Sequence, residues 1–163
     1  MVVVIMGVSG SGKSTLGELA AQELGGRFYE ADDYHTAANI NKMARGEPLG
    51  DEDRQPWLAV LADNITKWSR QDGVTILACS ALKHAYRLQL KGESGANVHF
   101  VYLHGDRELI YDRLAKRENH FMPITLLDSQ FATLEEPKEA TYISAALPGL
   151  KQLEKLKQFI KSI

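Results

Sequence analysis

The hydrophobic positions of the chain form short continuous runs separated by helical stripes. A continuous apolar run rich in β-branched residues occupies 2–6, which is typical of a parallel strand buried on both faces, and largely apolar runs at 74–78 and 98–103 predict two more strands. Two weaker runs at 27–30 and 141–145 predict two further strands. The intervening segments carry apolar residues three and four positions apart, as amphipathic helices do. This alternation predicts an α/β fold built on a five-stranded, doubly wound parallel sheet with right-handed crossovers.

The stripes also set the expected helix bounds. Helices are expected at 15–24 and 36–45, and a longer one begins at a cap formed by Asp51 or Asp53. That longer helix carries two tryptophans, which are expected in the core rather than stacked on a base. Asp106 is expected to cap the helix after the fourth strand. The last helix should turn one apolar stripe toward the sheet, namely Leu150, Leu153, Leu156 and Ile160.

Length and composition narrow the class of protein. A chain of 163 residues with 44% hydrophobic content is expected to form a single domain spanning 1–163. A net charge of −2 gives no support for nucleic acid or an anionic membrane as a partner. The single cysteine, Cys79, excludes an internal disulfide and suits a reducing compartment. Because no run is long enough to span a membrane and no signal peptide is evident, a cytoplasmic protein is expected.

A phosphate-binding motif lies between the first strand and the first helix. Residues 7–14 read GVSGSGKS and fit the pattern G-x-x-x-x-G-K-[ST] at every fixed position. Glycines let the backbone N–H groups approach a polyphosphate, and the helix N-terminus adds partial positive charge. An ordinary glycine-rich turn is disfavoured because the strand and the helix are both present. The residues expected to bind nucleotide phosphates are Gly7, Ser9, Gly10, Ser11, Gly12, Lys13, Ser14 and Thr15.

Within that motif, Lys13 is expected to reach the β- and γ-phosphates and the Ser14 hydroxyl to bind Mg²⁺. No Asn-Lys-x-Asp segment for reading guanine is present, so ATP is the expected nucleotide. The third strand lacks the terminal aspartate of ordinary ATPases, and the chain has no room for an effector domain. These features favour a small-molecule kinase over a switch or a motor. The five histidines show no paired-ligand spacing, so a structural metal site is not expected.

Charged residues follow several of the predicted strands. Glu30, Asp32 and Asp33 lie at or just beyond the end of the second strand, and ligands of open parallel sheets gather at the carboxyl ends of the strands. Asp32 and Asp33 could instead be turn or cap residues of the helix at 36–45. Two basic pairs are spaced four residues apart and so are expected to share helical faces, namely Lys83 with Arg87 and Arg113 with Arg117. A solvated basic face would have the same spacing.

Several internal blocks closely resemble the gluconate kinase family of P-loop kinases. The resemblance covers about 3–137 and is carried by blocks more specific than the phosphate loop. It implies a nucleoside-monophosphate-kinase-like fold, with a short helical lid at about 118–133 that includes a helix around 124–131. The matching blocks are His35, Asn39, Lys42-Met43, Gly46-x-Pro48-Leu49, Asp51-x-Asp53-Arg54, Pro56-Trp57-Leu58, Cys79-Ser80-Ala81-Leu82-Lys83, Tyr86-Arg87, His120-Phe121-Met122, Ser129-Gln130-Phe131 and Leu134-Glu135-x-Pro137.

The resemblance implies transfer of phosphate from ATP to D-gluconate, giving 6-phospho-D-gluconate; it also allows a homodimer. Asp32 is expected to orient the attacking hydroxyl and accept its proton. Arg54 suits the substrate carboxylate, because its planar guanidinium can bind it bidentately. Arg117 is expected to act in catalysis, reaching the phosphates as the lid closes and excludes water. The remaining expected contacts are Lys83, Arg87 and His35 to gluconate and Arg113 to adenine.

Some roles have alternatives, and the sequence departs from the family pattern at three places. His35 could equally be a helix cap. Thr36 stands where the family usually has proline and should loosen the helix start. Asn119 replaces a glycine that is usual in the flap. The segment 142–147 lacks an aspartate that is common in the family, which leaves the adenine contacts undefined. Another small hydroxy acid, such as shikimate, could be the acceptor. A nucleotide-binding regulatory module without turnover is the alternative from another class.

Overall fold

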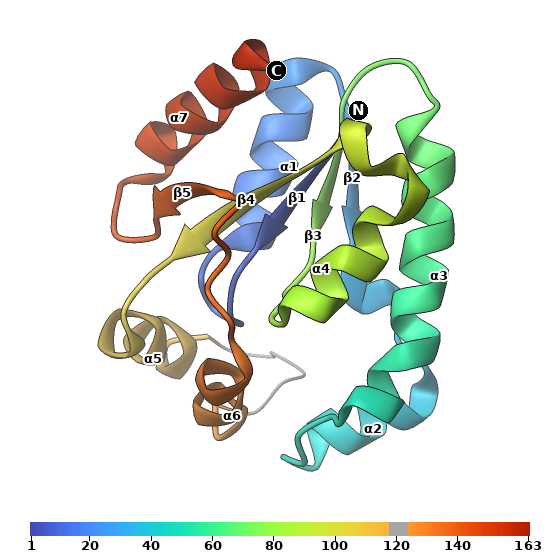
Figure 1. The fold of residues 1–163 in the computed structure, drawn as a ribbon. Coiled ribbons are helices and arrows are strands. Elements are labelled where there is room, and N and C mark those ends of the chain that lie inside the picture. Colours follow the sequence, from blue (N-terminus) through green and yellow to red (C-terminus); the bar gives the residue numbers. More distant parts are fainter. Residues whose placement is uncertain (118–123) are drawn as a thin grey trace.

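Five short runs of apolar and β-branched residues form one parallel sheet at the centre of the molecule (Figure 1). The computed structural model describes residues 1–117 and 124–163. The strands lie in the order β2-β3-β1-β4-β5, and in the central register Val4 pairs with Leu77 and Phe100. Their bounds are β1 Val2–Met6, β2 Arg27–Glu30, β3 Thr75–Ala78, β4 Val98–His104 and β5 Thr141–Ser144.

The continuous apolar runs arise because helices cover both faces of the sheet. Val3 and Ile5 point to the face covered by α1 (Lys13–Leu24) and α7 (Gly149–Ser162). Val2, Val4 and Met6 point to the opposite face, which α3 (Asp51–Ser69) and α4 (His84–Lys91) cover. All five residues of β1 are fully buried. With no solvent-facing side, the central strand needs apolar residues at every position.

The short helices α2, α5 and α6 lie beyond the carboxyl ends of the strands (Figure 1). A 3-10 turn, η1, follows β2 directly, and a second one, η2, joins α4 to β4. The turn η2 lies at the amino end of the strands, whereas η1, α2, α5 and α6 surround the carboxyl edge of the sheet and leave its two faces to the longer helices. Their bounds are η1 Ala31–Tyr34, α2 Ala37–Ala44, η2 Gly92–Asn97, α5 Arg107–Ala115 and α6 Leu126–Thr133.

The predicted five-stranded parallel sheet is confirmed, and so are the buried tryptophans and the Asp106 cap, whose carboxylate accepts from Leu109 N–H at 2.9 Å. The cap of α3 was predicted wrongly. Gly50 is the N-cap residue, and the Asp53 carboxylate reaches back to accept from the Gly50 N–H at 2.8 Å. At Thr36, where the resemblance implied a looser helix start, the hydroxyl caps α2 by accepting from Asn39 N–H at 3.1 Å.

Three side chains lie elsewhere than their spacing predicted. Lys83 precedes α4 as its N-cap, so it shares no helical face with Arg87. Arg117 lies beyond the last residue of α5. Leu150 is 76% exposed in the first turn of α7, where Gln152 is buried instead and donates to the carbonyls of Ala145 and Leu147. The backbone before α7 needs these donors, so a polar side chain occupies the inner position.

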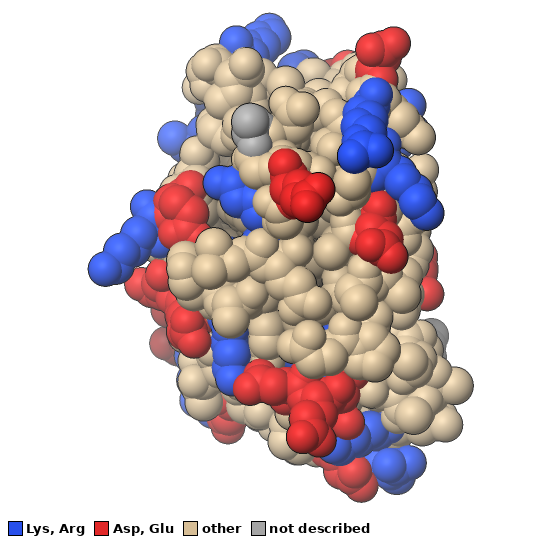
Figure 2. All heavy atoms as spheres, turned by 45° about the vertical axis from the view of Figure 1, so that its right-hand side comes forward, with Lys and Arg blue, Asp and Glu red and all other residues tan. Residues whose placement is uncertain are grey.

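The surface carries mixed charge. On the face shown in Figure 2, acidic and basic side chains are interspersed between wide areas of uncharged surface. The helices of the described ranges include none that is long and apolar enough to cross a membrane. The expected flap at 118–123, with Asn119, lies outside the described residues.

Candidate active site

The phosphate loop turns from β1 into α1 at the carboxyl edge of the sheet. Gly10 and Gly12 both have positive φ, at 82° and 98°, which glycine adopts without strain. A side chain at Gly10 would also meet Leu114 of α5 at 2.7 Å. The Ser11 hydroxyl is buried beneath the loop, so this residue can offer a ligand only its backbone. The sequence therefore builds a loop whose backbone can approach a phosphate closely.

Lys13 and Ser14 begin α1 and face the acids that follow β2. The Lys13 ammonium donates to the Val8 carbonyl at 2.9 Å. Burial lowers the pKa of Lys13, while Asp32 and Glu30 favour its charged form. The Ser14 hydroxyl donates to the Glu30 carboxylate, and burial raises the pKa of Glu30. The oxygens of Ser14 and Glu30 thus lie together at the end of α1, beside the only cation of the loop.

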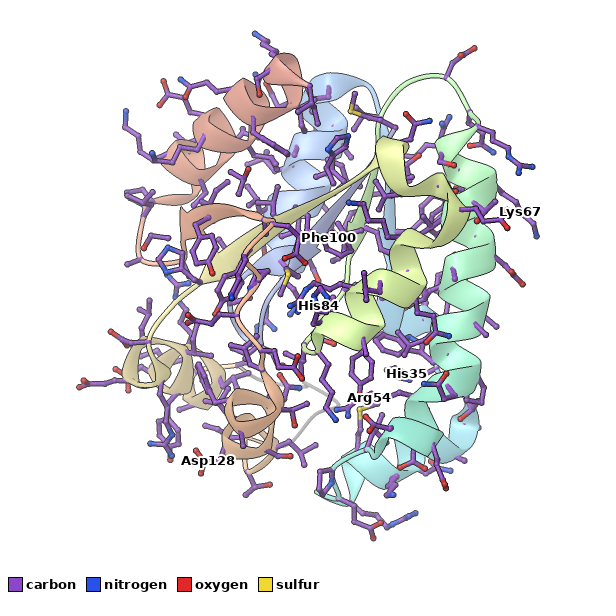
Figure 3. All side chains as sticks on the ribbon, in the orientation of Figure 1. His35, Arg54, Lys67, His84, Phe100 and Asp128 are labelled. Carbon is purple, nitrogen blue, oxygen red and sulfur yellow. The ribbon has the colours of Figure 1, made fainter. Side chains whose placement is uncertain are left out.

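A cleft on the β3 side of this loop brings the predicted acceptor residues together. Its lining includes Lys13 and Ser14 together with Asp32, His35 and Arg54. Figure 3 shows His35 and Arg54 near one another in the region between α2, α3 and α4. An apolar wall faces the charged groups and is formed by Met43, Leu49, Trp57 and Leu82. A carboxylate, a guanidinium and an apolar wall suit a small polar acid.

His35 is held firmly in that cleft. Its ring stacks on Trp57 with centroids 4.3 Å apart and planes 12° apart. Trp57 is fixed in turn because its indole N–H donates to the Ala31 carbonyl at 2.7 Å. His35 Nε2 lies 3.8 Å from Asp32 Oδ1. Burial, with a smaller effect of Arg54, lowers the pKa of His35 to about 4, so the imidazole is neutral at neutral pH.

Arg54 is oriented by groups behind the cleft. Its Nη1 donates to the Leu49 carbonyl at 2.8 Å and to the Tyr86 hydroxyl at 3.2 Å. The Tyr86 hydroxyl donates to the Asp51 carboxylate. Lys83 pairs with the same carboxylate at 2.9 Å and does not line the cleft. Lys83 therefore helps to hold the Asp51 carboxylate and Tyr86 behind Arg54, and it does not lie beside Asp32.

Arg87 is likewise outside the cleft. Its guanidinium is buried and donates to the carbonyls of Ala81 and Leu82 at 2.9 and 3.2 Å and to that of Glu135 at 3.0 Å. Glu139 lies 3.5 Å from its Nε. These contacts tie the segment after β3 to the segment after α6. The geometry gives Arg87 a structural position where the sequence suggested a substrate ligand.

A second cleft lies on the other side of the phosphate loop, against the start of α7. Thr15 and Arg113 line it, and Arg113 donates to the Ala145 carbonyl at 2.6 Å. The chain from Ala146 to Gly149 forms the opposite side. Gly10, Gly12 and Arg117 line both clefts. A molecule in the second cleft can thus reach one in the first across the loop and Arg117.

Two residues of the site carry no role in the sequence analysis. Glu30 ends β2, and its position after a strand was its only signal. Gln130 lies on α6, is buried, and accepts from the Ser9 N–H at 2.6 Å. It joins the expected lid helix to the phosphate loop over 121 positions of sequence, a distance that local spacing does not reveal.

The sheet order, the loop after β1 and the paired clefts define a P-loop kinase. The family described as AAA domain matches residues 2–137. A probable gluconokinase of Mus musculus is 47% identical over 152 residues, which cover 83% of this chain and 83% of that protein. The chain belongs to the gluconokinase family.

Solved structures agree with this assignment. A sugar kinase from Janibacter sp. HTCC2649 is 44% identical with a TM-score of 0.90, over 98% of this chain and 94% of that one. A gluconokinase from Sinorhizobium meliloti 1021 is 37% identical with a TM-score of 0.80, over 99% and 97%. A shikimate kinase from Aquifex aeolicus, at 18% identity and a TM-score of 0.67 over 99% and 96%, shares the fold alone.

Proposed function

We propose that this protein transfers the γ-phosphoryl group of ATP to the primary hydroxyl of D-gluconate, giving 6-phospho-D-gluconate and ADP. The observation that carries the proposal is the meeting of two clefts at Gly10, Gly12 and Arg117. One cleft has Asp32 and Arg54, which suit a hydroxyl and a carboxylate. Membership of the gluconokinase family supports this choice of acceptor over another hydroxy acid.

In the proposed reaction, the primary hydroxyl oxygen of gluconate attacks the γ-phosphorus in line. The bond from that phosphorus to the bridging oxygen breaks, and its electron pair leaves with ADP. The hydroxyl proton passes to the Asp32 carboxylate. Phosphoryl transfer depends mainly on positioning and charge neutralisation, which Arg54, Lys13 and Arg117 would supply.

We place ATP with its phosphates on the loop 7–14 and its base in the second cleft, beside Arg113. Backbone N–H groups at a helix N-terminus are suited to phosphate oxygens. Thr15 lies on the same side of the loop, at the second cleft. In this arrangement Arg117 lies between donor and acceptor, where its charge acts on the transferred group.

Mg²⁺ fits the oxygen donors beside the loop. Ser14 Oγ would bind it, with the Glu30 carboxylate alongside, and hard oxygen ligands are those Mg²⁺ prefers. The described residues hold no group of three or more His, Cys, Asp or Glu side chains arranged for a metal. Such a scarcity of protein ligands is typical of Mg²⁺ bound largely by substrate phosphates. The ion supplies charge neutralisation when bound.

A panel of acceptors tests the proposal. Purified protein with Mg-ATP is incubated with gluconate, glucose, shikimate and nucleoside monophosphates, and ADP release and product mass are measured. We expect turnover with gluconate to exceed that with the others. Equal or absent turnover across the panel would contradict the proposed acceptor.

The Asp32→Asn variant separates a kinase from a regulatory module. A kinase should lose kcat by about a hundredfold or more, since a general base contributes 10²–10⁴-fold. Its affinity for ATP should be retained, because Asp32 faces the acceptor. A protein that only binds nucleotide would have no turnover to lose.

A further inference from the structure

The side chain of Asn39 connects three parts of the acceptor cleft. It is buried on α2, one turn after His35. Its Nδ2 lies 2.7 Å from the Asp53 carbonyl and 3.3 Å from His35 Nδ1. A carbonyl oxygen can only accept, so the Asn39 atom facing it must be the NH₂ group. The same group has a second hydrogen for His35.

The direction of this contact fixes the proton on the imidazole. An NH₂ group can only donate, so His35 Nδ1 must be the bare, accepting nitrogen. A neutral imidazole then carries its proton on Nε2. The lowered pKa of His35 agrees with a neutral ring. Nε2 is the atom that faces Asp32 Oδ1 at 3.8 Å.

Two neighbours of the ring agree with this choice. Trp57 covers its face by stacking, and Arg54 is the nearby cation, which also disfavours a second proton. The His35 side chain is only 4% exposed. Asn39 is itself held by its backbone, since its N–H donates to the capping hydroxyl of Thr36.

We propose that Asn39 is a positioning residue that holds His35 in the Nε2–H tautomer, so that this N–H keeps the Asp32 carboxylate oriented toward the acceptor hydroxyl. The proposal deepens the proposed function and rests on it for the role of Asp32. The distance of 3.8 Å exceeds a hydrogen bond. We expect it to shorten when substrate fills the cleft, as contacts of catalytic groups often do.

The tautomer can be observed directly in the native protein. Nitrogen-15 NMR of histidine-labelled protein distinguishes a protonated from a bare ring nitrogen, and His35→Gln identifies the His35 signals. We expect the His35 proton on Nε2 at neutral pH. A proton on Nδ1, or on both nitrogens, overturns the proposal whatever the acceptor is, and the variant serves only to assign the signals.

Asn39→Asp tests the cause of the tautomer. A carboxylate can only accept, so His35 should move its proton to Nδ1, and kcat with gluconate should fall about tenfold or more while KM for ATP is unchanged. Lys42→Met is the matched control, because it removes the other tie between α2 and α3, the 2.8 Å pair of Lys42 with Asp53, and leaves the imidazole contact intact. An unchanged tautomer in Asn39→Asp overturns the proposal.

Two substitutions of His35 complete the test. The amide of His35→Gln can supply an N–H in place of Nε2–H and should retain most of kcat. His35→Phe keeps the stacking on Trp57, lacks the donor and should lose about tenfold. In the His35→Gln background, Asn39→Asp should cause little further loss, since no tautomer remains to be set.

An equal loss of kcat in both backgrounds would show that Asn39 acts independently of His35 and would overturn the proposal. Failure of wild-type protein to phosphorylate gluconate would instead contradict the proposed function. The NMR result stands apart from that outcome, because it is read without substrate.

Discussion

Tyr86 is the side chain on which the orientation of Arg54 depends. Its hydroxyl accepts from Arg54 Nη1 and donates to Asp51, so it links Arg54 to an acid outside the cleft. Burial raises the pKa of Tyr86, so the hydroxyl keeps its proton at neutral pH. The hydrogen bonds from Tyr86 and then Lys83 lower the pKa of Asp51. A protonated phenol between a guanidinium and a carboxylate can accept a hydrogen bond from the first and donate one to the second.

Tyr86→Phe should therefore loosen Arg54 without removing it. We expect KM for gluconate to rise about tenfold or more, the value of one hydrogen bond to a charged group, while kcat changes little. Steady-state kinetics at varied gluconate measures the effect. Tyr111→Phe is the control, because Tyr111 is exposed on α5 and lines neither cleft. A fall in kcat at unchanged KM would contradict a role in substrate binding.

Arg87 offers a contrasting case, because its contacts are structural. Arg87→Met should lower the free energy of unfolding by about 2 kcal/mol or more, since three carbonyl acceptors lose their donor. Arg87→Lys should recover only part of the loss, because an ammonium lacks the planar fork. Denaturant unfolding measures both. If KM for gluconate rises and stability is unchanged, Arg87 is a substrate ligand after all.

The phosphate loop needs glycine at position 10 for two reasons: the backbone has a positive φ, and there is no room for a side chain. Gly10→Ala meets both limits, because φ is 82° and the new methyl group would overlap Leu114 of α5. We expect a loss of more than tenfold in ATP affinity together with reduced stability, measured by calorimetry and thermal unfolding. Gly73→Ala is the matched control. Its φ of 84° is almost the same, but no atom lies within 4 Å, so it should show the strain of about 1 kcal/mol alone.

The elements near the loop were the easiest to predict from the sequence. The run at 2–6 is apolar at every position, and that at 98–103 is apolar except at His99, because both faces of the sheet are covered, and this pattern has few other causes. The phosphate motif specifies its own strand and helix. Caps were harder, since Gly50 leaves no side-chain signal and Asp53 satisfies the helix start from three residues inside it.

The roles of side chains could be predicted only where their positions in the sequence match their positions in the folded site. Asp32, His35 and Arg54 line one cleft as the resemblance implied. Lys83 and Arg87 appear as a basic pair in sequence, but one pairs with Asp51 and the other is buried under carbonyl groups. Spacing along a helix cannot tell which face is inside. Gln130 was missed because its contact joins two distant segments.

In the whole molecule, buried side chains pack on both faces of one sheet, and both clefts open at its carboxyl edge. Arg117, Gly10 and Gly12 are the residues common to both. Substrates that enter from separate sides therefore meet at a single line of backbone. Because these groups border both clefts, we expect occupation of one cleft to tighten binding in the other.

Cys79, directly after β3, is 1% exposed and lies against the strand that leads into the phosphate loop. Burial raises the pKa of its thiol to about 12, so an alkylating reagent can attack it only when the sheet opens. Nucleotide at 100 times its Kd should slow alkylation about 100-fold, because it binds the closed form. Mass spectrometry of timed samples measures the rate, with Cys79→Ser as the blank. Rapid labelling of the native protein would contradict this expectation. Slow labelling would make the alkylation rate of Cys79 a measure of how often the sheet opens.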